Sequence, residues 1–307
     1  MDPHAQRNKH SVVAAAKSIM NIKFAITRAT SRFLQIPAIW TFINATVIRL
    51  ADYLAFAHQH PHTVRGLREA HEQEQASLQS LFADKRVASG PFRGMAYPNF
   101  QSCGSQIAPK LIGSYEYELH GIIEQCLDAD YRRIIDIGCA EGYYAVGFAI
   151  RKPDAQVIAA DTSPTARELC AAMATINGVA DRLTTFDTID SRALISLVAD
   201  ERCLVLSDCE GYEKQLFTQE TSRHLTHSDL LIECHDYKDA SITPTIVAAF
   251  SDSHIVTKIY SQDEYFRPHQ YADERTANLT FAARRALMTE KRGPMVWLFC
   301  RSRSDSH

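Results

Sequence analysis

Several features that mark specialised protein classes are scarce in this 307-residue chain. Its eight cysteines form no C-x-x-C pair and mostly sit in apolar runs, which excludes a zinc ribbon and disfavours a disulfide scaffold. Gly (12) and Pro (11) are too few for a fibrous or low-complexity protein. No uncharged run is longer than the one over residues 33–48, which is too short to cross a membrane. We therefore expect a globular protein with reduced, buried thiols and a cytoplasmic location.

Charge is unevenly distributed along the chain, although the net charge is only −3. Residues 1–110 carry 13 Lys and Arg against 6 Asp and Glu, whereas the remainder carries 20 against 30. We expect a basic helical N-terminal region over residues 1–88, a Gly- and Pro-rich linker over 89–110 and an acidic domain over 111–303. The first ten residues are polar and no cleavable apolar segment follows them, which argues against a secretory signal.

The N-terminal region contains amphipathic helical patterns, such as the one over residues 12–29. Their apolar faces must be buried, and we expect them to form a homo-oligomer, with a dimer as the first choice. Contact with an anionic membrane surface is the less favoured alternative. Aromatic residues are not interleaved with the basic ones as in a single-strand binding platform, so nucleic acid is not an expected partner.

From residue 111 onwards, short apolar strands alternate with helices. Strands are predicted over residues 133–137, 156–160, 183–186, 203–206, 229–233, 255–259 and 295–300. Continuously apolar strands separated by helices are typical of a parallel sheet that is covered on both faces. The predicted fold is α/β, with a doubly wound, mostly parallel, seven-stranded sheet.

A glycine-rich turn between the first strand and its helix reads Asp136-Ile-Gly138-Cys-Ala-Glu-Gly142. Its glycines allow close approach of a ligand, and the helix start offers free N–H groups. A dinucleotide fingerprint would have glycine where Asp136 stands, so the acid favours a cationic or hydroxyl-rich ligand over a pyrophosphate. Asp161 ends the second strand, where an acid in doubly wound folds accepts both ribose hydroxyls.

These motifs together resemble the class I S-adenosylmethionine-dependent methyltransferase superfamily. The resemblance implies a Rossmann-like core and a set of cofactor-binding residues: Asp136, Gly138, Cys139, Ala140, Glu141, Gly142, Asp161, Thr162, Asp187 and Asp208. Asp190 could take the place of Asp187. The Asp-x-Glu-Gly-Tyr-Glu segment from Asp208 and the Leu-x-Glu-x-His segment ending at His235 further resemble the FkbM-type family, whose members are mostly O-methyltransferases of sugars and other natural-product hydroxyls.

Polar residues follow the fourth and fifth predicted strands, at the sheet edge where open α/β folds bind ligands. Methyl transfer requires alignment of the reactants and removal of a proton, so we expect His235 to act as the base, with Asp208 or Glu210 orienting it. Alternatively, Asp208, Glu210, Glu233 and His235 ligate a divalent metal. In a third interpretation, the acids cap helices. Glu213 is expected only to lie inside the next helix.

Substrate contacts are expected from Tyr115 and Glu116, which precede the first core strand, and from Glu233 and Asp236. The expected function is S-adenosylmethionine-dependent O-methylation of a small-molecule or sugar hydroxyl. One alternative is an RNA or protein methyltransferase that docks through the basic N-terminal region. A second is a non-catalytic protein that uses the fold for binding or oligomerisation.

Overall fold

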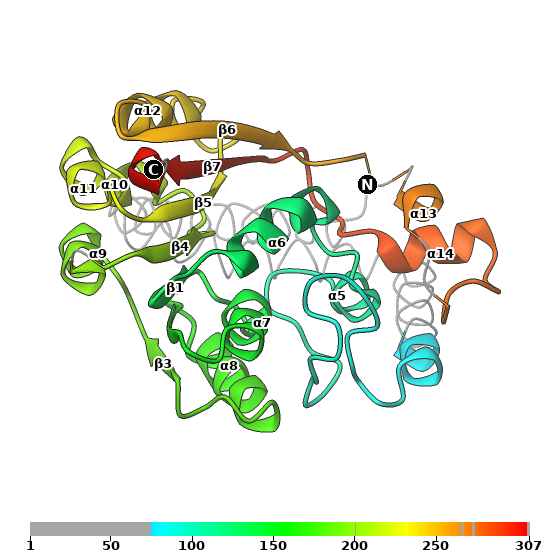
Figure 1. Ribbon diagram of the computed structural model, residues 1–307. Helices are drawn as coiled ribbons and strands as arrows, with labels where there is room; N and C mark the ends of the chain where they lie inside the picture. Colours follow the sequence, from blue (N-terminus) through cyan, green and yellow to red (C-terminus); the bar gives the residue numbers. More distant parts are fainter. Residues whose placement is uncertain (1–74, 200, 264, 266, 272–273, 306–307) are drawn as a thin grey trace, which may run out of the picture. The chain divides into compact units, whose positions relative to one another are not determined.

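The computed structural model describes residues 75–199, 201–263, 265, 267–271 and 274–305 (Figure 1). The chain divides into two compact units, 1–73 and 74–307, and the description concerns the second. The predicted N-terminal helices, and the oligomer or membrane contact expected from them, lie outside the described residues. No helix within the described ranges has the length and apolar character needed to cross a membrane.

A seven-stranded sheet forms the centre of this unit (Figure 1). Its strands are β1 (Arg133–Ile137), β2 (Gln156–Ala160), β3 (Leu183–Phe186), β4 (Cys203–Ser207), β5 (Asp229–Cys234), β6 (His254–Tyr260) and β7 (Val296–Ser302). They lie in the order β3-β2-β1-β4-β5-β7-β6, with β1 to β5 parallel and β7 antiparallel to both neighbours. The predicted doubly wound, mostly parallel sheet is confirmed.

Helices cover both faces of the sheet. One face packs against α6 (His120–Asp128), α7 (Tyr143–Arg151) and α8 (Pro164–Ile176). The other packs against α9 (Ser191–Val198), α10 (Glu213–Leu216), α11 (Gln219–His224) and α12 (Ile242–Phe250). Because side chains alternate along a strand, Ile134 and Leu204 belong to the first core, and Ile135 and Val205 to the second.

The segment predicted as a linker, residues 89–110, instead packs into the first core. Phe92, Met95 and Tyr97 are buried, and α5 (Ile107–Ile112) follows with its apolar side chains enclosed. The prediction of a linker is therefore wrong, because its glycines and prolines form turns that carry large apolar side chains inward. Gly90, for example, has φ 75° and lies against the backbone of Gly113.

Three further helical elements complete the unit: η2 (Tyr117–Leu119) before α6, and α13 (Arg267–Gln270) and α14 (Phe281–Met288) between β6 and β7. A short turn, η3 (Arg303–Asp305), follows β7. The helices α13 and α14 were not predicted. They are fastened to the segment after α5, where the Tyr271 hydroxyl donates to the Gly113 carbonyl oxygen over 2.8 Å.

Two helical glycines provide a test of this packing. A Cβ at Gly147 on α7 would lie 2.5 Å from the ring of Phe92, which is 2% exposed, whereas a Cβ at Gly121 on α6 would meet nothing within 4 Å. We expect Gly147→Ala to lower the free energy of unfolding by about 1–3 kcal/mol through overpacking. Gly121→Ala should raise it by about 0.5–1 kcal/mol, because alanine is the better helix former. Equal stabilities of the two variants in urea denaturation would show that residues 89–110 do not pack against α7.

Candidate functional site

Two adjoining cavities lie at the carboxyl ends of the parallel strands. The larger has a volume of about 900 Å³ and the smaller about 440 Å³. Gly138, Asp161, Asp208 and Glu210 line both, so the two cavities form one continuous cleft across β1, β2 and β4. This is where a doubly wound sheet binds ligands.

The glycine-rich turn forms one wall of the cleft. Asp136 is buried, and its Oδ2 accepts a hydrogen bond of 3.0 Å from the Ala145 N–H of α7, while burial raises its pKa to about 7. Gly138 has φ 89°, and a Cβ there would lie 1.7 Å from the Asp208 carbonyl oxygen, so only glycine lets the β1 and β4 loops approach this closely. Gly142 lines neither cavity. A Cβ at this position would lie only 2.8 Å from Cys170 Sγ, so the glycine packs closely against α8.

Of the three residues between these glycines, Cys139 and Ala140 line the larger cavity and Glu141 does not. Glu141 is buried and accepts a hydrogen bond of 2.5 Å from Lys110 Nζ and another of 3.0 Å from the Cys103 N–H. Burial opposes its ionisation, but the charge of Lys110 and the hydrogen bonds from Lys110 and Cys103 together outweigh this and lower the pKa of Glu141. The structure therefore gives Glu141 a partner in the protein rather than a place at the cavity wall.

The smaller cavity brings together the predicted residues of the second and third strands. Asp161 Oδ2 accepts from the Ala140 N–H over 3.0 Å, which ties the end of β2 to the glycine turn. Thr162, Asp187 and Asp190 also line this cavity, and Asp190 additionally caps α9 through the Ala193 N–H. Both acids considered for the third strand thus reach the cavity.

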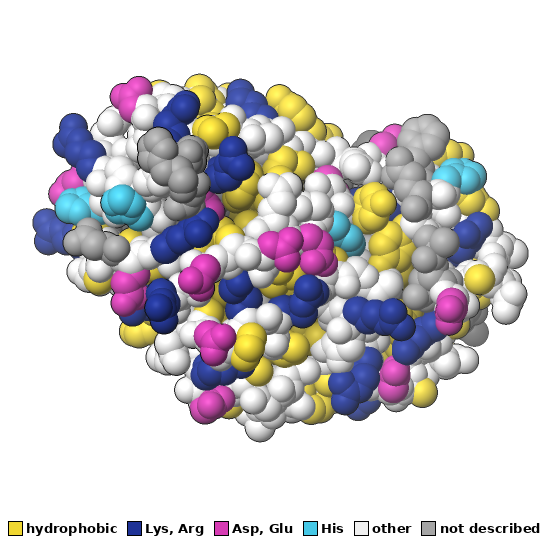
Figure 2. Space-filling view, viewed as in Figure 1, with side chains coloured by type: hydrophobic (Ala, Val, Ile, Leu, Met, Phe, Trp, Pro, Cys, Tyr) yellow, Lys and Arg dark blue, Asp and Glu magenta, His cyan; other side chains and the backbone are white. Residues whose placement is uncertain are grey.

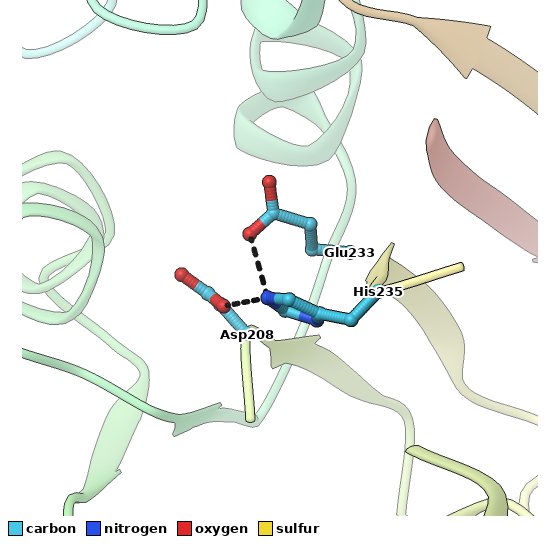
Figure 3. Close-up of side chains that lie close together, drawn as sticks. All are labelled: Asp208, Glu233 and His235. Atoms are coloured by element: carbon cyan, nitrogen blue, oxygen red, sulfur yellow. Dashed lines mark ion pairs between the residues drawn. The ribbon is translucent and has the colours of Figure 1, made fainter. Parts of the chain in front are cut away.

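His235, directly after β5, lies at the centre of the larger cavity's acidic wall (Figure 3). Its Nε2 is 3.4 Å from Asp208 Oδ1, 3.6 Å from Glu210 Oε2 and 3.9 Å from Glu233 Oε2. Its Nδ1 is 2.6 Å from Glu213 Oε1. Burial alone would lower the pKa of His235, but the hydrogen bond to Glu213 and the surrounding carboxylates raise it.

Glu213 is the residue that the sequence reasoning missed. It is fully buried at the start of α10, and it also accepts a hydrogen bond of 2.9 Å from the Gly211 N–H. Because Asp208 and Glu210 lie on the Nε2 side of His235, the group placed to orient the imidazole is Glu213, and the expectation for the two other acids is wrong. Helical spacing could not have indicated it, because Glu210 lies in the loop before α10, with φ 55°.

Asp208 and Glu233 come from neighbouring strands and face each other beside His235 (Figure 3). The Asp208 carboxyl is enclosed by the cavity, although 39% of the side chain reaches solvent, and burial raises its pKa to about 6. Burial and the charges of Asp208 and Glu116 raise the pKa of Glu233 well above its usual range. Single ligand atoms of Asp208, Glu233 and His235 lie within 4.8 Å of one another, which is close enough to hold a metal ion.

Two arginines that no sequence motif indicated balance part of this charge. Arg292, in the loop before β7, lies 2.9 Å from Glu116 Oε1 and 3.1 Å from Glu233 Oε1. It also contacts Glu118 and Glu290, both of which pair with the buried Arg267 of α13. The segment between β6 and β7 therefore supplies the counter-charges of the site.

The predicted substrate residues fall into two groups. Tyr115 and Glu233 line the larger cavity. Glu116 is buried behind it, where it accepts hydrogen bonds from Tyr144 and Arg292. Asp236 is not brought to either cavity: its carboxylate accepts from the N–H and the hydroxyl of Thr243, at 2.9 and 2.7 Å, and so caps the start of α12.

One face of the described residues shows mixed charge. On the face of the described residues seen in Figure 2, Lys and Arg side chains are interspersed with Asp and Glu side chains and do not gather into one basic patch. This face therefore lacks the charge pattern of a nucleic-acid interface.

No family model and no curated relative matches this chain. Solved structures with a similar fold include precorrin-6y C5,15-methyltransferase from Geobacter metallireducens (12% identity, 59% of this chain and 85% of that chain, TM-score 0.39). Others are a SAM-dependent methyltransferase from Geobacter sulfurreducens in complex with S-adenosyl-L-homocysteine (15%, 60% and 89%, 0.36) and the O-methyltransferase TomG from Streptomyces achromogenes in complex with SAM (12%, 62% and 81%, 0.38). The strand order and the antiparallel β7 are those of the Rossmann-like methyltransferase fold.

The Lys110–Glu141 pair separates a structural role from a cofactor role for Glu141. We expect Glu141→Gln to lower the free energy of unfolding by about 3–5 kcal/mol, because it leaves the buried Lys110 ammonium without its partner. Glu124→Gln, which breaks the half-exposed pair with Arg151, should cost less than about 1 kcal/mol in the same urea titration. If Glu141→Gln leaves the free energy of unfolding unchanged but weakens S-adenosylhomocysteine binding in calorimetry, Glu141 binds the cofactor and its structural role is contradicted.

Proposed function

We propose that this protein is an S-adenosylmethionine-dependent methyltransferase that methylates a hydroxyl group of a small-molecule acceptor. The observation that carries the proposal is the lining of the smaller cavity. Apolar side chains of Ile137, Ala160 and Ile189 meet the acids Asp161 and Asp187 there, and none of the described lining residues is basic. Such a cavity suits an uncharged nucleoside and lacks the cationic groups that would favour a pyrophosphate.

The protein's own residues fit the chemical groups of the cofactor. Asp161 keeps lone pairs for ribose hydroxyls while its two oxygens hold the Ala140 and Ser163 N–H groups. Asp208, at the junction of the two cavities, offers a carboxylate toward a cationic group. Bound S-adenosylmethionine supplies an electrophilic methyl group on a positively charged sulfur.

His235 is the proposed base. The proton on Nδ1 is donated to Glu213, so the lone pair on Nε2 faces the cavity. When Nε2 takes up a proton, Asp208, Glu210 and Glu233 stabilise the resulting imidazolium. Nε2 accepts the hydroxyl proton as the oxygen gains the methyl group. This arrangement uses a base oriented by a carboxylate, as in other proton-transfer sites.

A divalent metal on Asp208, Glu233 and His235 is the alternative, since metal ions also lower the pKa of a bound hydroxyl. The two mechanisms use the same Nε2 lone pair of His235, one for a proton and the other for a metal ion, and respond differently to chelators. Sugars and other natural-product hydroxyls, the acceptors of the FkbM-type family, remain the acceptor class that we propose.

Asp161→Ala tests the cofactor site. We expect the dissociation constant of S-adenosylhomocysteine to rise about tenfold or more in calorimetry, because the variant loses the ribose acceptor and the tie to the glycine turn. The matched control is Asp154→Ala, which changes an exposed acid at the opposite end of the same strand. Equal binding by the wild type and both variants, or no binding by any of them, would contradict the proposed function.

His235→Ala and Glu213→Gln test the base. In a screen of hydroxylated acceptors that measures S-adenosylhomocysteine release, we expect His235→Ala to reduce kcat about 10²–10⁴-fold. Glu213→Gln should lower kcat and shift the rising limb of the pH profile to lower pH, because loss of the Glu213 charge lowers the pKa of His235. Chelator should leave wild-type activity unchanged. Activity that chelator abolishes and Mg²⁺ restores would assign the cluster to a metal instead.

A further inference from the structure

More carboxyl groups than cations surround the larger cavity. Seven carboxylates surround its acidic wall, namely those of Glu116, Glu118, Asp208, Glu210, Glu213, Glu233 and Glu290. The cations paired with them are Arg267, Arg292 and Lys238, together with His235 when it is protonated. Lys110 and Lys291 also line the cavity. Lys110 is paired with Glu141, and even with Lys291 the cations are fewer than the carboxyl groups. A bound cation would therefore be stabilised here.

A second feature points to a ligand at the same place. Trp297 lines the larger cavity and is 2% exposed, yet its indole Nε1 has no hydrogen-bond partner among the described residues. In the β5–β7 ladder, Trp297 stands directly opposite Glu233, so both side chains project from the same face of the sheet. A buried N–H donor without a partner is costly, and an oxygen atom of a ligand would satisfy it.

Aromatic rings enclose this part of the cavity. Tyr115 and Tyr143 are buried in its wall and pack edge to face at 5.3 Å between ring centroids. Their faces already meet a protein cation: Lys110 Nζ lies 4.8 Å from the Tyr115 ring centroid and 5.6 Å from that of Tyr143. This wall therefore accommodates an ammonium group beside carboxylates. Anions are disfavoured for the converse reason.

We propose that the methyl acceptor is a 1,2-amino alcohol, such as the amino-hydroxy unit of an amino sugar, whose ammonium group binds between Asp208 and Glu233. The inference rests on the proposed function and specifies its acceptor. With the ammonium on these carboxylates, the neighbouring hydroxyl reaches His235 Nε2, which lies 3.4 and 3.9 Å from their oxygens. Trp297 Nε1 then donates to a further oxygen of the acceptor.

Three small probes that differ in charge test this inference on the full-length protein: ethanolamine, ethylene glycol and glycolate. Their binding is measured by ligand-observed NMR titration, with and without saturating S-adenosylhomocysteine. We expect ethanolamine to bind at least about tenfold more tightly than ethylene glycol, because hydrogen bonds between charged groups are stronger than those between neutral ones. Glycolate should not bind, because its negative charge is repelled by the carboxylates. The two titrations keep the proposed function and this inference apart. If S-adenosylhomocysteine does not bind, the proposed function is contradicted. The preference for ethanolamine is measured both with and without S-adenosylhomocysteine, so it is tested whether or not the cofactor product binds.

Two variants locate the subsite. Glu233→Gln should remove the preference for ethanolamine over ethylene glycol. Trp297→Phe, which removes only the N–H donor, should change the affinity of neither probe, because neither has the further oxygen to which Nε1 donates. Glu168→Gln, an exposed acid on α8, is the control and should change neither. Three results would each overturn the inference. The wild type could bind ethanolamine and ethylene glycol with equal affinity, it could bind glycolate more tightly than either, or Mg²⁺ could displace ethanolamine at a concentration below the dissociation constant of ethanolamine.

Discussion

The site depends on the arginines that hold mutually repelling carboxylates close to one another. Buried acids on neighbouring strands and loops would drive the carboxyl edge of the sheet apart if nothing balanced them. Arg267 and Arg292 provide this balance, because each guanidinium reaches several carboxylates at once in a way that a lysine could not. The segment between β6 and β7 is therefore as much a part of the site as the strands that carry the acids.

The balance is incomplete on the side that faces the cavity, and this determines what the site can do. Asp208 and Glu233 meet next to His235. Burial raises the pKa of both, and the charge of Asp208 raises that of Glu233 further, whereas the hydrogen bond from Glu233 partly offsets the rise at Asp208. A site of this kind favours positively charged or hydroxyl-bearing ligands, and it stabilises a proton on the imidazole. The same arrangement thus links the cofactor, the base and the acceptor proposed for this protein.

The strands could be predicted closely from the sequence. The first three predicted strands coincide with β1, β2 and β3, and the later ones differ only at their ends. Apolar runs bounded by turn residues leave little freedom to buried parallel strands such as β2 and β4, whereas β3, an exposed edge strand, is marked by its place in the strand–helix alternation. The segment over residues 89–110 and the helices α13 and α14 were mispredicted or missed. Their glycines, prolines and charged residues have turn and surface propensities, which long-range packing overrides.

The sequence by itself determined the sheet, its glycine turn and the strand ends at which Asp161, Asp208, Glu233 and His235 appear, because parallel strands bring their carboxyl ends to one edge. Only the tertiary structure decided how the acids divide their roles. It placed Glu213 on His235 Nδ1, withdrew Glu141 to Lys110 and gave Asp236 to a helix cap. A carboxylate has no intrinsic role in sequence, because its nearest cation, donor or cavity defines its chemistry. In this protein such a partner can lie far along the chain, 176 residues away in the pair of Glu116 with Arg292.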